Sequence, residues 1–244
     1  MTAPVFSEHV AAVRGEGEQI LAAAGQGGLD VPVPTCGDWT MRDLLVHVGS
    51  VYHRAGTVVG ERATAPVAWQ QPADDIEDPV GHLSDALDEL IHALSDADAD
   101  TPVWNWSGDD QVAGFWARRM AHESAVHRYD AQRAHGVAQP IDDDLAYDGM
   151  DELVDVILPR IVTRDELTLP SQSYTFSALD DGAWHVALDE AGVHRLDALK
   201  DPDVVVRATA SGLLLGAYAR VPWTSLDVDG DDQALARWTD TFKF

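Results

Sequence analysis

Two helical segments that carry inward-facing ionisable side chains constrain this chain most. In RRMAHESAVHRYDAQRAHG, Glu123 and His127 are four residues apart, so they lie on one face of a helix about one turn apart. Far upstream, in WTMRDLLVHVGSVYHRAG, His47 falls on the apolar stripe that includes Leu44 and Val48. A carboxylate and two imidazoles directed into a helical core are hard to explain by packing alone. They match three protein ligands of a metal ion whose fourth position is open.

A second interpretation of these residues is a core histidine hydrogen-bonded to a buried glutamate. Burying an unpaired carboxylate costs several kcal/mol, so Glu123 needs either a cation or a protonated partner. With two histidines facing the same core, a divalent cation is the simplest single solution. Two His and one Glu suit zinc best, and other divalent first-row ions remain open.

The stretch AHESAVH is similar to the zinc-protease motif H-E-x-x-H, but its spacing differs. His122 and His127 are five residues apart, which rotates them by about 140° around a helix, so they cannot share one ion. Glu123 is therefore expected to be a ligand rather than a general base, and His122 a packed or surface histidine. Asp130 is expected either to hold the ring of His127 or to be solvated. His53 is expected at the mouth of the pocket or on the surface.

The first part of the chain predicts a four-helix bundle. Thr40 and Asp43 form a capping-box pattern at the start of one helix, and a Pro- and Asp-rich connection, APVAWQQPADDIEDP, follows that helix. Bundle cores are a common place for metal sites built from facing helices. The expected helices span residues 6–24, 40–56, 81–97 and 112–135.

The pattern changes after Pro140, where short runs with strand character appear among helical ones. That order predicts an α+β domain over residues 141–244, after a first domain over 1–140. We expect strands in SYTFSAL, AWHVALD, DVVVRAT and SLDVDG. The expected helices are residues 142–161, ASGLLLGAYAR and DDQALARW.

The charge balance excludes two broad classes of partner. The chain has 42 acidic and 16 basic residues and a formal net charge of -26, so it should repel nucleic acid and anionic membranes. Binding of an anion would need a local basic pocket. The arginines of interest for such a pocket are Arg118, Arg119, Arg128, Arg133 and Arg220.

The chain has 1 cysteine, Cys36, so no intramolecular disulfide can form and a reducing cytoplasm is the expected location. No apolar run approaches the ~20 residues of a membrane span, and MTAPVFSEHV lacks the features of a signal peptide. Cys36 precedes the helix that begins near Thr40, whereas His47 should lie roughly 10 Å further along the helix axis. A permanent cysteine ligand would also close the fourth position. We therefore expect Cys36 to be inert and any catalytic thiol to come from outside the chain.

The pairing of WTMRDLLVHVGSVYHRA with RRMAHESAVHRYDAQRAHG resembles the mycothiol-dependent maleylpyruvate isomerase family of actinobacteria. That family has a DinB-like four-helix N-terminal domain and a small α+β domain related in shape to sterol-carrier modules. The family's ligands are the His of a W-T-x-x-x-L-x-x-H pattern and the Glu and His of an E-x-x-x-H segment, which match His47, Glu123 and His127. The second domain is matched by DVVVRATASGLLLGAYARVPWTSLDVDGDDQALARW. The resemblance covers nearly the whole chain.

The resemblance implies a zinc enzyme that activates the thiol of mycothiol as a thiolate. Addition to an electrophilic small molecule then gives cis–trans isomerisation or S-transfer, and the metal site does not distinguish the two. Arg220 is implied as the catalytic contact to substrate carboxylates, although this chain has AYARVPW where a Gly-Arg pair is more usual. His53 and Arg220 are the expected contacts to the thiol cofactor. The expected assembly is a monomer or homodimer.

Two functions of other classes stay open. One is a non-catalytic metal-binding module, such as a stress or regulatory protein, in which the ion only staples the bundle. The other is a metal-dependent hydrolase, for which the sequence offers no well-placed general base.

Overall fold

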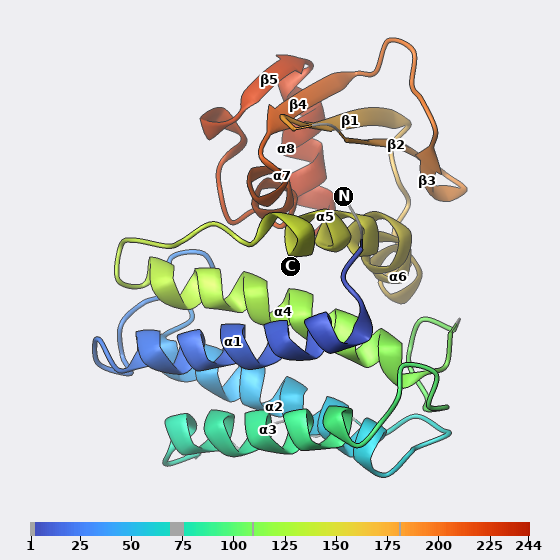
Figure 1. Cartoon of the computed structure of the whole chain (residues 1–244). Coiled ribbons are helices and arrows are strands. Elements are labelled where there is room, and N and C mark those ends of the chain that lie inside the picture. The colour runs from blue at the N-terminus through green and yellow to red at the C-terminus, as the bar shows by residue number, and fades with distance from the viewer. Residues whose placement is uncertain (1–2, 69–75, 109, 181) are drawn as a thin grey trace. The chain divides into compact units, whose positions relative to one another are not determined.

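Four helices form the N-terminal unit, Pro4–Gln139, which is one of the two units into which the chain divides. The structure is a computed structural model that describes residues 3–68, 76–108, 110–180 and 182–244. The expected four-helix bundle is confirmed, and Figure 1 shows its helices side by side. They are α1 (Phe6–Ala24), α2 (Met41–Gly60), α3 (Pro79–Ser95) and α4 (Ala113–Arg133).

Local signals set where two of these helices begin. At the start of α2, the Thr40 hydroxyl accepts a hydrogen bond from the backbone N–H of Asp43 (3.4 Å), and the Asp43 carboxylate accepts one from the backbone N–H of Thr40 (2.8 Å). This is the predicted capping box. The third helix begins two residues earlier than expected, because Asp78 caps α3 and Pro79 occupies its first turn.

The helices pack in two main pairs, α2 with α3 and α1 with α4. The predicted end of the second helix at Gly56 is wrong, because α2 continues to Gly60. Gly56 instead allows the close approach of α3, since a β-carbon there would lie only 3.3 Å from the Cα atom of Leu90. The fully buried apolar side chains of the bundle include Val13, Ile20, Leu44, Leu45, Val48, Tyr52, Leu83 and Leu90.

The second unit contains Pro140–Phe244 and is α+β, as predicted. Its sheet has the strand order β3-β2-β1-β4-β5, in which β1 and β4 are parallel and the other pairs antiparallel. The strands are β1 (Gln172–Ala178), β2 (Ala183–Asp189), β3 (Gly192–Leu196), β4 (Val204–Ala208) and β5 (Asp227–Gly230). Its helical segments are α5 (Asp143–Glu152), η1 (Leu153–Ile157), α6 (Leu158–Arg164), α7 (Ala210–Ala217), η2 (Trp223–Ser225) and α8 (Asp232–Thr241).

The structure corrects two predicted helices in this unit and adds one strand. The expected helix over 142–161 is divided by the π-helical segment η1, which precedes Pro159, a residue that cannot donate to the carbonyl of Asp155. Strand β3 was not predicted, because it lies at the sheet edge without a buried alternation. Helix α7 ends at Ala217, before the left-handed Ala219 (φ 58°), so Arg220 lies outside it.

Among the helices of the described residues, none combines the length and the apolar character needed to cross a lipid bilayer.

Candidate metal centre

The three expected ligands lie together inside the N-terminal unit. His47 comes from α2, Glu123 and His127 come from α4, and their ligand atoms are all within 4.8 Å of one another. The Glu123 Oε1 atom lies 3.2 Å from His127 Nε2 and 3.4 Å from His47 Nε2. Two imidazole nitrogens thus converge on one carboxylate oxygen.

These separations are close to those between the ligand atoms of a bound ion. Ligand atoms held about 2.0–2.2 Å from a tetrahedral zinc ion lie roughly 3.3–3.6 Å from one another. The two measured nitrogen–oxygen separations, 3.2 and 3.4 Å, lie at or just below this range. The donor set of two imidazoles and a carboxylate therefore fits a divalent first-row ion and leaves a further position for another ligand.

A buried contact between the two helices fixes the ligands' spacing. The Tyr52 hydroxyl of α2 and the Ser124 hydroxyl of α4 are 2.6 Å apart, and neither side chain is exposed. Burial raises the pKa of Tyr52 well above its ordinary range, so the phenol stays protonated as a hydrogen-bonding group. Since Ser124 follows Glu123 directly, this contact holds α4 against α2 at the level of the site.

Arg119 neutralises the glutamate from the other side. Its Nη2 atom donates to Glu123 Oε2 at 2.8 Å, one helical turn away, and its side chain is only 7% exposed. Burial by itself would raise the pKa of Glu123, but hydrogen bonds with His127 and His47 and the charge of Arg119 hold it well below its usual range. Glu123 is therefore ionised, which is the form that binds a metal ion.

Asp130 holds the ring of His127 and is not solvated, as one of the two interpretations of the sequence predicted. Its Oδ2 atom lies 3.0 Å from His127 Nδ1, and its Oδ1 atom accepts a hydrogen bond of 2.6 Å from the Thr35 hydroxyl. A carboxylate on Nδ1 orients the ring and leaves Nε2 for a metal. Burial by itself would lower the pKa of His127, but hydrogen bonds with Asp130, Cys36 and Glu123 raise it well above its ordinary value.

Two residues of the loop between α1 and α2 also belong to this site, and the sequence did not place them there. Cys36 forms a second group with His127 and Asp130, with ligand atoms within 4.8 Å of one another, so its expected separation from the site is wrong. The ring of Trp39 lies 4.9 Å from that of His47 and 6.4 Å from that of His127. The pattern W-T before the helix was the only sequence signal near Trp39.

The loop folds back because its ends pair with each other. Pro32 and Thr40 form an isolated β-bridge, and the backbone N–H of Val33 donates to the carbonyl of Trp39 at 2.8 Å. Within it, the N–H of Cys36 donates to the Val33 carbonyl at 3.0 Å. This short hairpin brings the thiol back beside α4 instead of extending it away from the helix.

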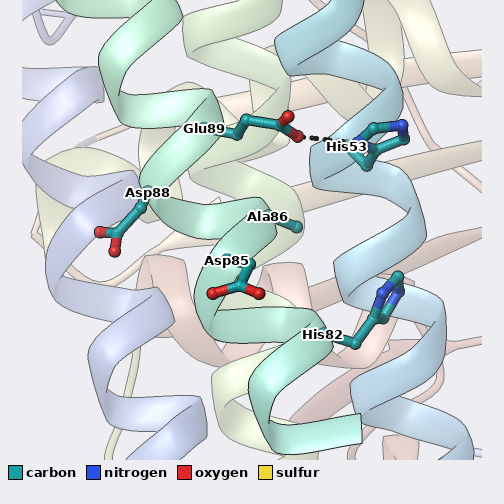
Figure 2. Close-up of a pocket in the computed structure, with 6 residues that line it drawn as sticks. All are labelled: His53, His82, Asp85, Ala86, Asp88 and Glu89. Carbon is teal, nitrogen blue, oxygen red and sulfur yellow. Dashed lines mark hydrogen bonds and ion pairs between the residues drawn. The ribbon is translucent and has the colours of Figure 1, made fainter. Parts of the chain in front are cut away.

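The structure places His53 in a different pocket. His53 Nδ1 lies 2.7 Å from Glu89 Oε2 of α3, and Figure 2 shows the two side chains directed toward each other. With His82 and Asp85, they line a pocket of about 500 Å³ that does not include His47. The reason is the helical rotation: six residues turn a side chain by about 240°. His53 therefore lines this pocket, and its expected contact to the thiol cofactor stays a prediction.

His122 and Arg220 were also singled out in the sequence. His122 is 1% exposed and its ring meets that of His9 of α1 edge-on at 6.0 Å, so the expected packed histidine is confirmed. Arg220 belongs to the C-terminal unit, where its Nη1 atom donates to the carbonyl of Tyr218 at 3.0 Å. Its role as an anion contact stays a prediction.

Comparisons with known proteins agree with both halves of the chain. The model of the mycothiol maleylpyruvate isomerase N-terminal domain matches residues 10–132, and the model of the MDMPI C-terminal domain matches residues 144–237. No curated protein sequence matches the chain.

Two solved structures share the fold. A mutant form of the mycothiol-dependent maleylpyruvate isomerase has a TM-score of 0.65 at 12% identity, covering 94% of this chain and 96% of that chain. A second structure of the mycothiol-dependent maleylpyruvate isomerase has a TM-score of 0.60 at 13% identity, covering 90% of this chain and 91% of that chain. Since the N-terminal model alone matches more than half of the sequence, the chain belongs to the mycothiol maleylpyruvate isomerase family.

Proposed function

We propose that this protein is a metal-dependent enzyme that activates a low-molecular-weight thiol, with mycothiol as the first candidate, for addition to an electrophilic small molecule. The observation that carries the proposal is the convergence of His47 Nε2 and His127 Nε2 on Glu123 Oε1. A zinc ion held there would supply an open position at which a thiol ionises to the nucleophilic thiolate at neutral pH. Membership of the family supports the choice of a thiol over other ligands.

The chain's own residues have defined tasks in this proposal. Asp130 keeps the proton of His127 on Nδ1, so that Nε2 faces the centre. Glu123 supplies a negatively charged oxygen. The ring of Trp39 lies beside both histidines and packs against them. These contacts would orient the three candidate ligands toward one another.

The reaction that follows depends on the fate of the adduct. Thiolate addition to a cis double bond leaves a single bond that can rotate, and elimination then returns the trans isomer and the thiol. Release of the adduct would instead be S-transfer. Arg220 is the residue that we propose as the contact to substrate carboxylates, because an anionic substrate needs a local cation in a protein with a net charge of -26. His53 has no part in this proposal, because it lies in the pocket between α2 and α3.

A second candidate function is a non-catalytic metal-binding module. The observation that favours it is the position of Cys36, within 4.8 Å of a His127 nitrogen and an Asp130 oxygen. A cysteine that joined the three ligands would close the coordination of zinc, as in structural sites.

Metal analysis followed by a thiol titration separates the two candidates. For an enzyme, we expect about one divalent ion per chain in both the wild type and Cys36→Ser, and a rise in melting temperature when mycothiol is added. For a structural site, Cys36→Ser should lose the metal and added thiol should have no effect. Absence of bound metal from the protein refolded with zinc would reject both.

A further inference from the structure

Arg119 divides the two oxygens of Glu123 between different partners. The guanidinium Nη2 atom donates to Oε2 at 2.8 Å, whereas Oε1 is the oxygen that lies 3.2 and 3.4 Å from the two imidazole nitrogens. Arg119 is 7% and Glu123 20% exposed. A charge-assisted hydrogen bond in such a buried place is strong and restricts the rotation of the carboxylate.

The number of Glu123 oxygens that bind a metal ion decides how many of the ion's coordination positions remain open. A carboxylate can bind a cation through one oxygen or through both. With His47 and His127 as the other ligands, a glutamate bound through both oxygens would complete four positions and leave none for a thiol. A glutamate bound through Oε1 alone leaves one position open, which is the feature that separates catalytic from structural zinc sites.

We propose that Arg119 is a positioning residue that holds Glu123 in one-oxygen coordination and thereby keeps the thiol-binding position open. This inference rests on the proposed function and adds a residue to it. Arg119 acts through Glu123 and needs no contact with the thiol or the substrate. Arg119 and Glu123 are one turn apart on α4, so the contact that holds Oε2 lies within a single helix. The number of open positions would then be set by α4 alone.

The charges around the site support the same role. Arg119, Glu123 and Asp130 contact one another or His127, and together they carry one net negative charge. A divalent ion bound by neutral imidazoles brings the sum to one net positive charge, which a single thiolate neutralises. Without Arg119 the charge would already balance without the thiolate, and an anionic ligand would be attracted less.

The test uses the full-length protein loaded with cobalt(II), which takes N and O ligands as zinc does. The visible absorption of cobalt depends on the identity and geometry of its ligands, and a bound thiolate adds a charge-transfer band. Wild type, Arg119→Met and Arg119→Lys are titrated with 2-mercaptoethanol. The matched control is Arg118→Met, which makes the same charge change on the same helix but about 100° around its axis.

We expect Arg119→Met to bind the thiol about 10- to 100-fold more weakly than the wild type, the range typical of groups that orient metal ligands. Its thiol-free cobalt spectrum should change in band position and shape, because the second oxygen of Glu123 would take the position that a water or a thiol otherwise occupies. Arg119→Lys, which keeps a cationic donor, should restore the wild-type spectrum and most of the thiol affinity. Arg118→Met should match the wild type.

Two results would overturn the inference. One is an unchanged spectrum and thiol affinity in Arg119→Met. The other is a loss of cobalt affinity with normal thiol binding by the loaded fraction, which would make Arg119 a general support for Glu123. If Arg119→Met does not fold, Arg119→Ala, which also removes the donor to Oε2, is measured in its place, and the same two results decide. Failure of the wild type itself to bind cobalt or thiol would reject the proposed function instead.

Discussion

The bundle and the α+β unit differ in what they bury. In the bundle, ionisable side chains of α4 form a continuous chain of contacts from Arg119 to Asp130, and Asp130 is fully buried. In the α+β unit the interior is aromatic, with the ring of Trp238 5.0 Å from that of Tyr174 and 5.1 Å from that of Phe176. The candidate ligands thus lie among ionisable groups, whereas aromatic rings pack against one another around Trp238.

The ion pairs of the two units show the same difference. Arg119 contacts Glu123 at 2.8 Å in the bundle, and Arg195 contacts Asp155 at 2.7 Å in the α+β unit. The lengths are nearly equal, but the Arg119 side chain is 7% exposed and that of Arg195 39%. Because water screens the exposed pair, it contributes little, whereas removal of one partner from the buried pair leaves an uncompensated charge. Burial, and not bond length, therefore separates the two pairs in their expected contribution to stability.

The largest effect should come from removing a metal ligand. We expect His47→Ala to abolish metal binding and activity while the bundle stays folded, because the side chain is 31% exposed and contributes little to the core. Metal content and far-ultraviolet circular dichroism measure the two outcomes. His53→Ala is the matched control on the same helix and should keep its metal. Global unfolding of His47→Ala would favour the structural staple, and loss of metal from both variants would contradict the site described above.

A large but different effect is expected in the aromatic interior. Trp238 is 1% exposed, and its indole N–H donates to the carbonyl of Ala217 at 3.0 Å. Trp238→Ala should lower the free energy of unfolding by about 3–5 kcal/mol through the cavity that it leaves. Urea unfolding followed by circular dichroism measures the loss, and Trp238→Phe should lose less. Metal affinity should not change in the folded fraction. A matching loss of metal affinity would show that the two interiors are not independent.

The pH dependence of the metal-free protein should report the polar interior. The pKa of His127 is raised well above 6.5, so the folded state binds more protons than the unfolded state at pH values above 6.5. The contribution of His127 to the free energy of unfolding is therefore fully present below pH 6.5. It is lost as the pH rises toward the raised pKa, by up to about 1.4 kcal/mol per pH unit.

The lowered pKa of Glu123 has the opposite sign. Its contribution is present above the ordinary value of 4.5 and is lost as the pH falls through the lowered pKa. Urea unfolding at a series of pH values measures both limbs. In His127→Gln, the free energy of unfolding should depend less on pH above 6.5 than in the wild type. The same pH dependence in this variant would contradict the raised pKa of His127.

The smallest effect is expected at the exposed pair. Arg195 contacts Asp151 and Asp155, both at 2.7 Å, and all three side chains are more than one-third exposed. Arg195→Ala should change the free energy of unfolding by less than about 1 kcal/mol, and less again at high salt. Urea unfolding at two salt concentrations checks this. A larger, salt-independent loss would remove the distinction between the two kinds of ion pair.

Features that depend on neighbouring residues could be predicted from the sequence. The capping box of Thr40 and Asp43 marked the start of α2, and the four-residue spacing of Glu123 and His127 placed both on one face of α4. The helical period also directed His47 toward α4 and separated His122 from the ligands. These predictions succeeded because helix geometry converts sequence separation directly into direction.

Features that depend on distant residues were decided only by the tertiary structure. Thr35 and Asp130 are 95 residues apart, and no local pattern joins them. Cys36 lies close to His127 because a bridge between Pro32 and Thr40 folds the loop back. Sequence spacing alone had placed Cys36 farther from the site. Which oxygen of Glu123 binds Arg119 and which faces the histidines is likewise a matter of packing. The sequence by itself therefore determined the helices of the bundle and the residue types of the candidate ligands. The surroundings of these residues depend on long-range contacts, which no helical or strand period encodes.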